Sequence, residues 1–326
     1  MAKTRLGFDL GSSSMKIALL RDGAVSRIET VRVPDNMIDP TGAVTLPHAF
    51  TQFLRQTRKE LSLPRAPVSL VLPAAQVICR MVTMPKMTAG QLAMNLPYEF
   101  SDFIQGVPDQ YHCDYAMCRP VSEEEENVMP MMAAVASKSR LAEYYRIFTQ
   151  AGLPLKVVLP QEMALIQLVR RQEERREFCF VDLGHLSTRI TAVWGDRVQA
   201  TRQIALGGRN LDMAIADELG VDAFLAGTYK MENYQDIQSH SGVTDLCDRI
   251  AVEILKVINF YQFTYRSSEL EGIYLTGGGA ALPALREAIA GMVDLELLDP
   301  GELLTGGKEG AEAGIFAAGA ALGGQS

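Results

Sequence analysis

The sequence predicts an α/β protein of two related lobes, because one hairpin motif occurs twice along the chain. The pattern Asp-Leu-Gly-x-x-Ser begins at Asp9 and again at Asp182. Each copy lies between two apolar segments, which is the pattern of two strands joined by a tight glycine turn. A second turn signal follows at the same distance in both cases, Asp22-Gly23 and Gly195-Asp196. This spacing is far longer than a solenoid repeat. It favours two lobes that face each other with a ligand held between them.

The hairpin motif carries groups that bind phosphate. Glycine lets the backbone approach a ligand closely, and serine hydroxyls and turn N–H groups donate to phosphate oxygens. Lys16 adds a positive charge within reach of a β- or γ-phosphate. The alternative is an ordinary hairpin whose hydroxyls satisfy their own turn, but the second copy favours the phosphate interpretation. The motif is neither a P-loop nor a dinucleotide fingerprint, since a strand and not a helix follows the turn.

Length and composition restrict the class of protein. The chain has 326 residues, of which 48% are hydrophobic and 21% charged, as in a soluble globular protein with room for two cores. The net charge of −8 argues against nucleic-acid binding. Five scattered cysteines suit a reduced, cytoplasmic protein better than a disulfide framework. Neither a signal peptide nor a membrane-spanning apolar run is visible. We therefore expect no direct insertion into a membrane; if this protein works at a membrane, a partner must hold it there.

The first lobe is expected to span residues 1–175, with a core of 1–84 and 156–175. Alternating and periodic apolar residues predict its elements. In order, these are strands within 4–33, a helix at 50–61, strands at 68–72 and 77–84 in the same sheet, and a connecting helix at 161–171.

An inserted subdomain is expected at residues 85–155. Thr88 can cap a helix that runs toward Ile104 with a kink at Pro97. Two strands and a second amphipathic helix complete a compact α-β-β-α unit. The two strands are expected at 112–118 and 129–136, and the helix at 141–148.

The second lobe is expected to span residues 176–326. Its predicted parts are a core of 176–206 and 267–326 and a small subdomain of 207–266. The polar segment 232–244 reads as an exposed, mobile loop before a long helix. Small residues dominate a C-terminal helix at 310–322, which is expected to pack at the lobe interface.

Five motifs along the chain together carry a resemblance to a known family. They are Asp9-Leu-Gly-Ser-Ser-Ser-Met-Lys16, Gly152-Leu-Pro154, Ile204-Ala-Leu-Gly-Gly208, Phe260-Tyr-Gln262 and Leu275-Thr-Gly-Gly-Gly-Ala280. These motifs resemble those of the actin/Hsp70/sugar-kinase ATPase superfamily, whose fold is actin-like (ribonuclease H-like). Within it, the chain is similar from end to end to the PilM family of type IV pilus assembly, and its insertion lies where PilM and FtsA proteins carry their extra subdomain.

The resemblance implies a bound ATP with Mg²⁺ and gives roles to individual residues. Asp9 and Asp182 would orient Mg²⁺ through water. Glu162 would orient a nucleophilic water, although a carboxylate at a helix start is equally consistent with the helix dipole. Lys230 would contact the ribose or the adenine edge. The other nucleotide-binding residues implied are Gly11, Ser12, Ser13, Ser14, Lys16, Gly184, Ser187, Gly208, Gly277, Gly278 and Gly279.

Two departures from the superfamily pattern bear on activity. Gly227 stands where the family often has a glutamate that contacts the ribose, and Ala281 stands where chaperones have an adenine-stacking arginine. We therefore expect ATP binding with weak or no ATPase activity.

The resemblance also implies a partner. A groove between the first lobe and the insertion would take the short N-terminal tail of a PilN-like inner-membrane protein, which would hold this chain at the membrane. Apolar side chains suit such a groove but suit the subdomain core equally well. The candidates are Leu92, Leu96, Tyr98 and Phe100.

Three functions remain open from the sequence. The first is an ATP-binding scaffold for type IV pilus or type II secretion assembly, with self-association also open. The second is an FtsA-like division protein that polymerises at the membrane; such proteins end in an amphipathic helix, whereas this sequence ends in Gly323-Gly324-Gln325-Ser326. The third is a small-molecule kinase, for which Glu162 is the one candidate base.

Overall fold

The computed structural model describes residues 3–34, 36–171, 177–265, 270 and 272–323, and the chain forms two compact units. The first unit comprises Met1–Gln172, Gly195–Val198 and Phe316–Ser326. The second comprises Glu173–Trp194 and Gln199–Ile315. The C-terminal helix therefore divides between the units at Phe316, whereas the sequence placed the whole of it in the second lobe.

Each unit is built on a five-stranded sheet, and the two sheets have the same topology. In spatial order the first sheet contains β3 (Ala24–Arg32), β2 (Ser14–Arg21), β1 (Thr4–Leu10), β4 (Val68–Leu72) and β8 (Leu155–Pro160). The second contains β11 (Arg197–Ile204), β10 (Thr188–Trp194), β9 (Glu177–Leu183), β12 (Gly272–Thr276) and β13 (Glu296–Leu298). In both, the first strand of the hairpin is antiparallel to its successor and parallel to a later strand on its other side. The duplication extends from the motif to the whole sheet.

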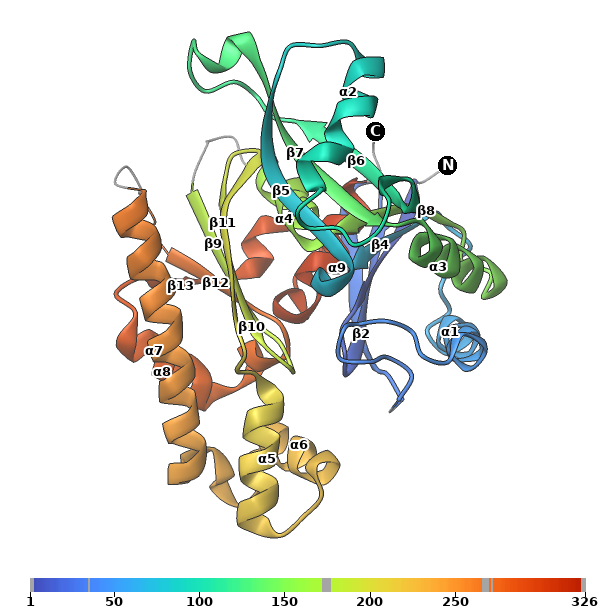
Figure 1. Ribbon diagram of the computed structural model, residues 1–326. Helices are drawn as coiled ribbons and strands as arrows, with labels where there is room; N and C mark the ends of the chain where they lie inside the picture. The colour runs from blue at the N-terminus through green and yellow to red at the C-terminus, as the bar shows by residue number, and fades with distance from the viewer. Residues whose placement is uncertain (1–2, 35, 172–176, 266–269, 271, 324–326) are drawn as a thin grey trace. The chain divides into compact units, whose positions relative to one another are not determined.

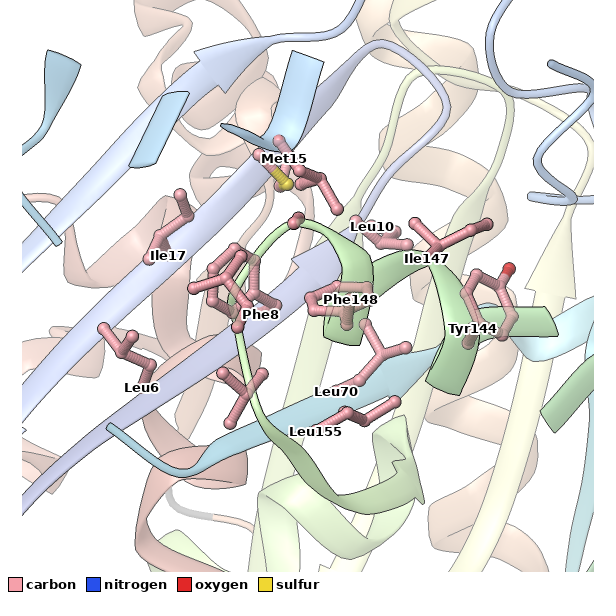
Figure 2. Close-up of a cluster of buried hydrophobic side chains, with 14 of the residues drawn as sticks. Leu6, Phe8, Leu10, Met15, Ile17, Leu70, Tyr144, Ile147, Phe148 and Leu155 are labelled. Carbon is pink, nitrogen blue, oxygen red and sulfur yellow. The ribbon is translucent and has the colours of Figure 1, made fainter. Parts of the chain in front are cut away.

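One face of the first sheet holds an apolar core against two helices, α1 (Pro47–Glu60) and α3 (Lys138–Gln150). Side chains alternate across a strand, so Leu6, Phe8 and Leu10 all point to this face. Phe8 meets Phe148 of α3 edge to face, with ring centroids 5.3 Å apart (Figure 2). Helix α3 thus belongs to the core of the first sheet and not to the insertion in which the sequence placed it.

The opposite face of β1 is covered by the small-residue helix α9 (Ala311–Gly323), which in turn packs on α4 (Gln161–Val169). A Cβ on Gly7 of β1 would lie 1.8 Å from the carbonyl oxygen of Ala317 in α9. A Cβ on Gly319 would lie 2.2 Å from the carbonyl oxygen of Ala164 in α4. Such close approach is possible only without side chains, which explains the alanine and glycine content of α9.

A separate three-stranded sheet makes up the small subdomain of the first unit (Figure 1). Its order is β5 (Val77–Pro85), β7 (Val128–Ser137) and β6 (Tyr111–Met117). The strand at 77–84 was expected in the first sheet; this prediction was wrong, because β5 pairs along its whole length with β7. A buried strand looks the same in sequence whichever sheet it joins.

Helix α2 (Ala89–Asn95) covers this small sheet and begins at a capping box. Thr88 accepts the backbone N–H of Gln91, as predicted, and the Gln91 side chain accepts the N–H of Thr88. The helix is shorter than expected and gives way to a 3₁₀ segment, Leu96–Phe100. Pro97 explains this, since its ring obstructs a continuing α-helix.

The second unit also carries the helices α5 (Gly208–Leu219), α6 (Ala223–Glu232), α7 (Ser241–Thr264) and α8 (Pro283–Met292). The expected mobile loop between α6 and α7 is instead a 3₁₀ segment, Tyr234–Ser239. Ile237 is fully buried in the core, and the Gln238 amide donates to the carbonyl oxygen of Lys230 at 2.8 Å. The few apolar residues of this polar run show no regular period and so gave too little signal to predict this.

The close packing of α9 leads to a stability prediction. Gly319→Ala should lower the melting temperature, because overpacking costs about 1–3 kcal/mol and exceeds the gain of about 1 kcal/mol in helix propensity. Gly291→Ala in α8 is the matched control, since nothing lies within 4 Å of its Cβ position. It should raise the melting temperature slightly in calorimetry. Equal effects of the two substitutions would contradict the packing account.

Candidate functional site

The first hairpin closes through its glycine. The Gly11 N–H donates to the carbonyl oxygen of Ser14 at 3.0 Å. A Cβ on Gly11 would lie 2.8 Å from that oxygen and 3.2 Å from the Lys16 ammonium nitrogen. The turn is therefore restricted to glycine, and Lys16 reaches back over it. Ser12, Ser13 and Ser14 lie in the same turn.

Asp9 lies just before this turn, directly across from Lys16 in the strand register. Its side chain shares the face of β1 that carries Gly7, and it is 7% exposed. Burial raises the pKa of the Asp9 carboxyl, and the charge of Lys16 partly opposes this rise. A buried carboxylate with a raised pKa gains from any additional cation placed beside it.

The second hairpin repeats this geometry. The Gly184 N–H donates to the Ser187 carbonyl oxygen at 3.1 Å, and a Cβ on Gly184 would lie 2.8 Å from that oxygen. Arg189 lies across from Asp182 in register, in the place that Lys16 has in the first hairpin. Arg189 was not among the residues expected from the sequence, although it follows Asp182 at the spacing at which Lys16 follows Asp9.

The loop of the second hairpin is fixed to the start of α5. The N–H of Gly208 donates to the Gly184 carbonyl oxygen at 2.9 Å, and the N–H of Arg209 donates to that of His185 at 2.7 Å. A Cβ on Gly207 would lie within 2.8 Å of three backbone atoms of this loop. Gly207 therefore holds the loop closed, and Gly208 lies beside it.

Lys230 forms a buried ion pair that the sequence did not reveal. Its Nζ lies 2.5 Å from Oδ1 of Asp212 and donates to the Gly208 carbonyl oxygen at 3.1 Å. Lys230 is 7% exposed and Asp212 5%. His185 Nδ1 lies 3.6 Å from the other oxygen of Asp212. The pair therefore joins α6 to α5 and to the hairpin loop. The one trace of it in the sequence is Asp212, which lies one helical turn after Gly208.

The glycine run packs on the strand that carries Asp182. Gly277 has a φ of +83°, and its Cβ would lie 2.4 Å from Oδ1 of Asp182. A Cβ on Gly279 would lie 2.8 Å from Cβ of Leu183, whereas nothing lies within 4 Å of that position on Gly278. Backbone at Gly278 is therefore open to a ligand's approach.

The remaining candidates fall in different environments. Glu162 lies in the first turn of α4 and is 4% exposed. Leu92, Leu96 and Phe100 are fully buried with β5 and β7 and form the core of the small sheet rather than a groove. Tyr98, the fourth groove candidate, is 69% exposed. In the described ranges, no group of three or more His, Cys, Asp or Glu side chains is arranged to hold a metal ion.

The environment of Asp9 predicts a pH-dependent gain in stability. A raised carboxyl pKa costs stability above that pKa, and the cost vanishes below the pKa of an unfolded aspartate, about 3.9. Asp9→Asn should therefore raise the ligand-free melting temperature at pH 7, by a margin that disappears toward pH 4. Each pKa unit of the rise corresponds to about 1.4 kcal/mol.

Asp39→Asn is the control with the opposite sign. The Thr41 hydroxyl, 2.6 Å away, lowers the pKa of Asp39, so this substitution should destabilise at pH 7 and lose its effect as the pH falls through that lowered pKa. A lower melting temperature for Asp9→Asn at pH 7 would contradict this account of the Asp9 site.

Comparison with solved structures shows the fold. A PilM-PilN type IV pilus biogenesis complex is similar at 24% identity over 99% of this chain and 98% of that one, with a TM-score of 0.80. The ethanolamine utilization protein EutJ from Carboxydothermus hydrogenoformans is 14% identical over 99% and 89%, with a TM-score of 0.57. An MreB protein of Spiroplasma citri bound to AMPPNP is 9% identical over 97% and 94%, with a TM-score of 0.55. The fold is actin-like, as the motifs predicted.

Two further findings bear on the class of protein. Within the described part of the chain, none of the helices combines the length and apolar content needed to cross a bilayer. The family model described as type IV pilus assembly protein PilM matches residues 7–307. The chain therefore belongs to the PilM family of type IV pilus assembly proteins.

Proposed function

We propose that this chain is a cytoplasmic scaffold that binds Mg-ATP and docks to the N-terminal tail of a PilN-like inner-membrane protein during pilus assembly. The observation that carries the nucleotide part is the duplicated hairpin. Each copy presents a closed glycine turn with an aspartate and a cationic side chain opposite each other in register. Peptide N–H groups, hydroxyls and cations are the donors that phosphate oxygens require.

The residues of both hairpins fit a nucleotide with its metal. Ser12, Ser13, Ser14 and Lys16 would bind phosphate oxygens from one hairpin, and Gly184 and Ser187 from the other. Asp9 and Asp182 would hold Mg²⁺ through its water, which suits an ion that keeps part of its hydration shell. The raised pKa of Asp9 supports this role, because a nearby divalent cation would favour its ionised form. The MreB protein with the same fold was solved with AMPPNP bound.

Lys230 and the glycine run would complete the adenosine side. We propose that Lys230, held by Asp212, contacts the ribose or the adenine edge, and that Gly277, Gly278 and Gly279 let the adenosine lie against the backbone. The open Cβ position on Gly278 supports such an approach. The positive charge of bound Mg²⁺ would offset the negative charge of the phosphates. Glu162 would orient a water molecule near the phosphates, and ATP hydrolysis would be slow or absent.

The partner part rests on family membership and on a solved relative. The similar structure is a PilM-PilN complex. Since three of the four groove candidates are core residues, the tail of a PilN-like protein would contact other exposed groups of the first unit, with Tyr98 among the candidates. Docking to such a tail would place the chain at the inner face of the cytoplasmic membrane.

Thermal unfolding with Mg-ATP tests the nucleotide part. At a ligand concentration 100 times the Kd, a native-state ligand stabilises by about 2.7 kcal/mol, so the wild type should melt several degrees higher. Lys16→Ala should lose most of this shift, because it removes the cation beside the phosphate turn. Lys59→Ala, at an exposed position near the end of α1, should retain it. No shift in the wild type would refute ATP binding.

A further inference from the structure

The turn between β10 and β11, together with the first two residues of β11, is bound to the loop that joins β6 and β7 of the small sheet. We call these residues, 195–198, the strap. Arg197 of the strap donates to both carboxylate oxygens of Glu125, at 3.0 and 3.1 Å. It also donates to the carbonyl oxygen of Arg119 at 2.6 Å. In return, the N–H of Arg119 donates to Asp196 Oδ2 at 2.9 Å. The two segments are joined by reciprocal bonds.

This contact is buried and specific. Arg197 is 6% exposed, although arginine is rarely buried without partners. Its two-pronged pairing holds the pKa of Glu125 below its usual range. Bidentate, charge-assisted bonds fix orientation as well as distance, and removing one partner of a buried pair leaves the other uncompensated. The strap therefore holds the β6–β7 loop in one position.

The strap also reaches the centre of the small sheet. The N–H of Val198 donates to Sδ of Met132 at 3.5 Å, and Met132 lies on the middle strand, 2% exposed. The Cys118 thiol donates to the carbonyl oxygen of Asp196 at 3.5 Å. A displacement of the strap would therefore disturb β7 as well as the β6–β7 loop.

Strand β10 leads from the strap back to the loop of the second hairpin. Strand β10 begins at Thr188, directly after Ser187 of the hairpin loop, and runs for seven residues to Trp194, just before the strap. At about 3.3 Å per residue this is roughly 20 Å of strand. Thr188 is fully buried, and its hydroxyl donates to the Leu206 carbonyl oxygen at 2.9 Å. One strand therefore joins the candidate phosphate loop to the strap.

We propose that the strap transmits the ligand state of the Gly184–Ser187 loop to the small sheet. A phosphate bound at this loop would hold β10, and Arg197 would pass this restraint to the β6–β7 loop and the edge strand β6. Tyr115 and Met117 of β6 are 38% and 43% exposed. The inference rests on the proposed nucleotide binding and assigns its regulatory output to the Arg197–Glu125 pair. Couplings of this kind change affinities or protection by roughly 5- to 150-fold.

Hydrogen exchange of the full chain with and without Mg-ATP tests this role. In the wild type, Mg-ATP should slow exchange at residues 111–125 by at least about fivefold. Arg197→Gln and Glu125→Gln should keep the Mg-ATP affinity, measured by titration, within about threefold and should lose this slowing. Arg202→Gln is the matched control, since Arg202 lies exposed on the same strand β11, and it should respond as the wild type does.

The outcomes separate transmission from a merely structural role. Faster exchange in the ligand-free variants with an undiminished response to Mg-ATP would overturn the proposal, as would a wild type that binds Mg-ATP without any change at residues 111–125. If the wild type fails to bind in the titration, nucleotide binding itself is refuted and the proposal with it. Should Arg197→Gln not fold, Glu125→Gln carries the test, because Glu125 is the more exposed partner, at 26% of its side chain.

Discussion

The same hydrogen bond closes both hairpins and determines their geometry: a glycine N–H donates to the carbonyl oxygen three residues later. It joins Gly11 to Ser14 and Gly184 to Ser187. Because a Cβ on either glycine would lie 2.8 Å from the accepting oxygen, no other residue fits without moving the turn. The closed turn sets the register that puts an aspartate opposite a cation, and it leaves further backbone and hydroxyl donors of the loop for a ligand.

The structure also depends on three pairs of oppositely charged side chains. Asp9 lies across from Lys16, Asp212 contacts Lys230, and Arg197 contacts Glu125. At least one residue of each pair is buried, and such pairs contribute little net stability, since desolvation offsets their attraction. We interpret them as positioning devices: the first places a carboxylate beside the first glycine turn, the second fixes α6 to α5, and the third fixes the strap to the small sheet.

The sequence predicted the parts of the fold that depend on local patterns. The hairpins, the Thr88 cap and the small-residue helix α9 follow from turn chemistry, capping and composition, which act over a few residues. Strand β5 and helix α3 were assigned to the wrong sheet, because their periodicity shows that a face is buried and not what buries it. The duplicated topology confirms what the repeated motif indicated, since each copy brings its own sheet.

The candidate site was predicted in its glycines and aspartates but not in its supporting residues. Gly11 and Gly184 are visible as a motif, whereas Asp212 and Arg189 take part only because α5 and β10 bring them to the loop. Leu92, Leu96 and Phe100 show the converse: an apolar helix face reads equally as groove or core, and the contacts with β7 decide for the core.

The central proposal is that the two glycine hairpins bind Mg-ATP, and isothermal titration with Mg-ATP tests it most directly. Gly11→Ala and Gly184→Ala disturb the two turns in the same way, because each adds a Cβ 2.8 Å from the carbonyl oxygen that closes the turn. The account predicts one site per chain and at least a tenfold loss of affinity, about 1.4 kcal/mol, in either variant. Wild-type affinity in either variant, or two independent sites per chain, would contradict it.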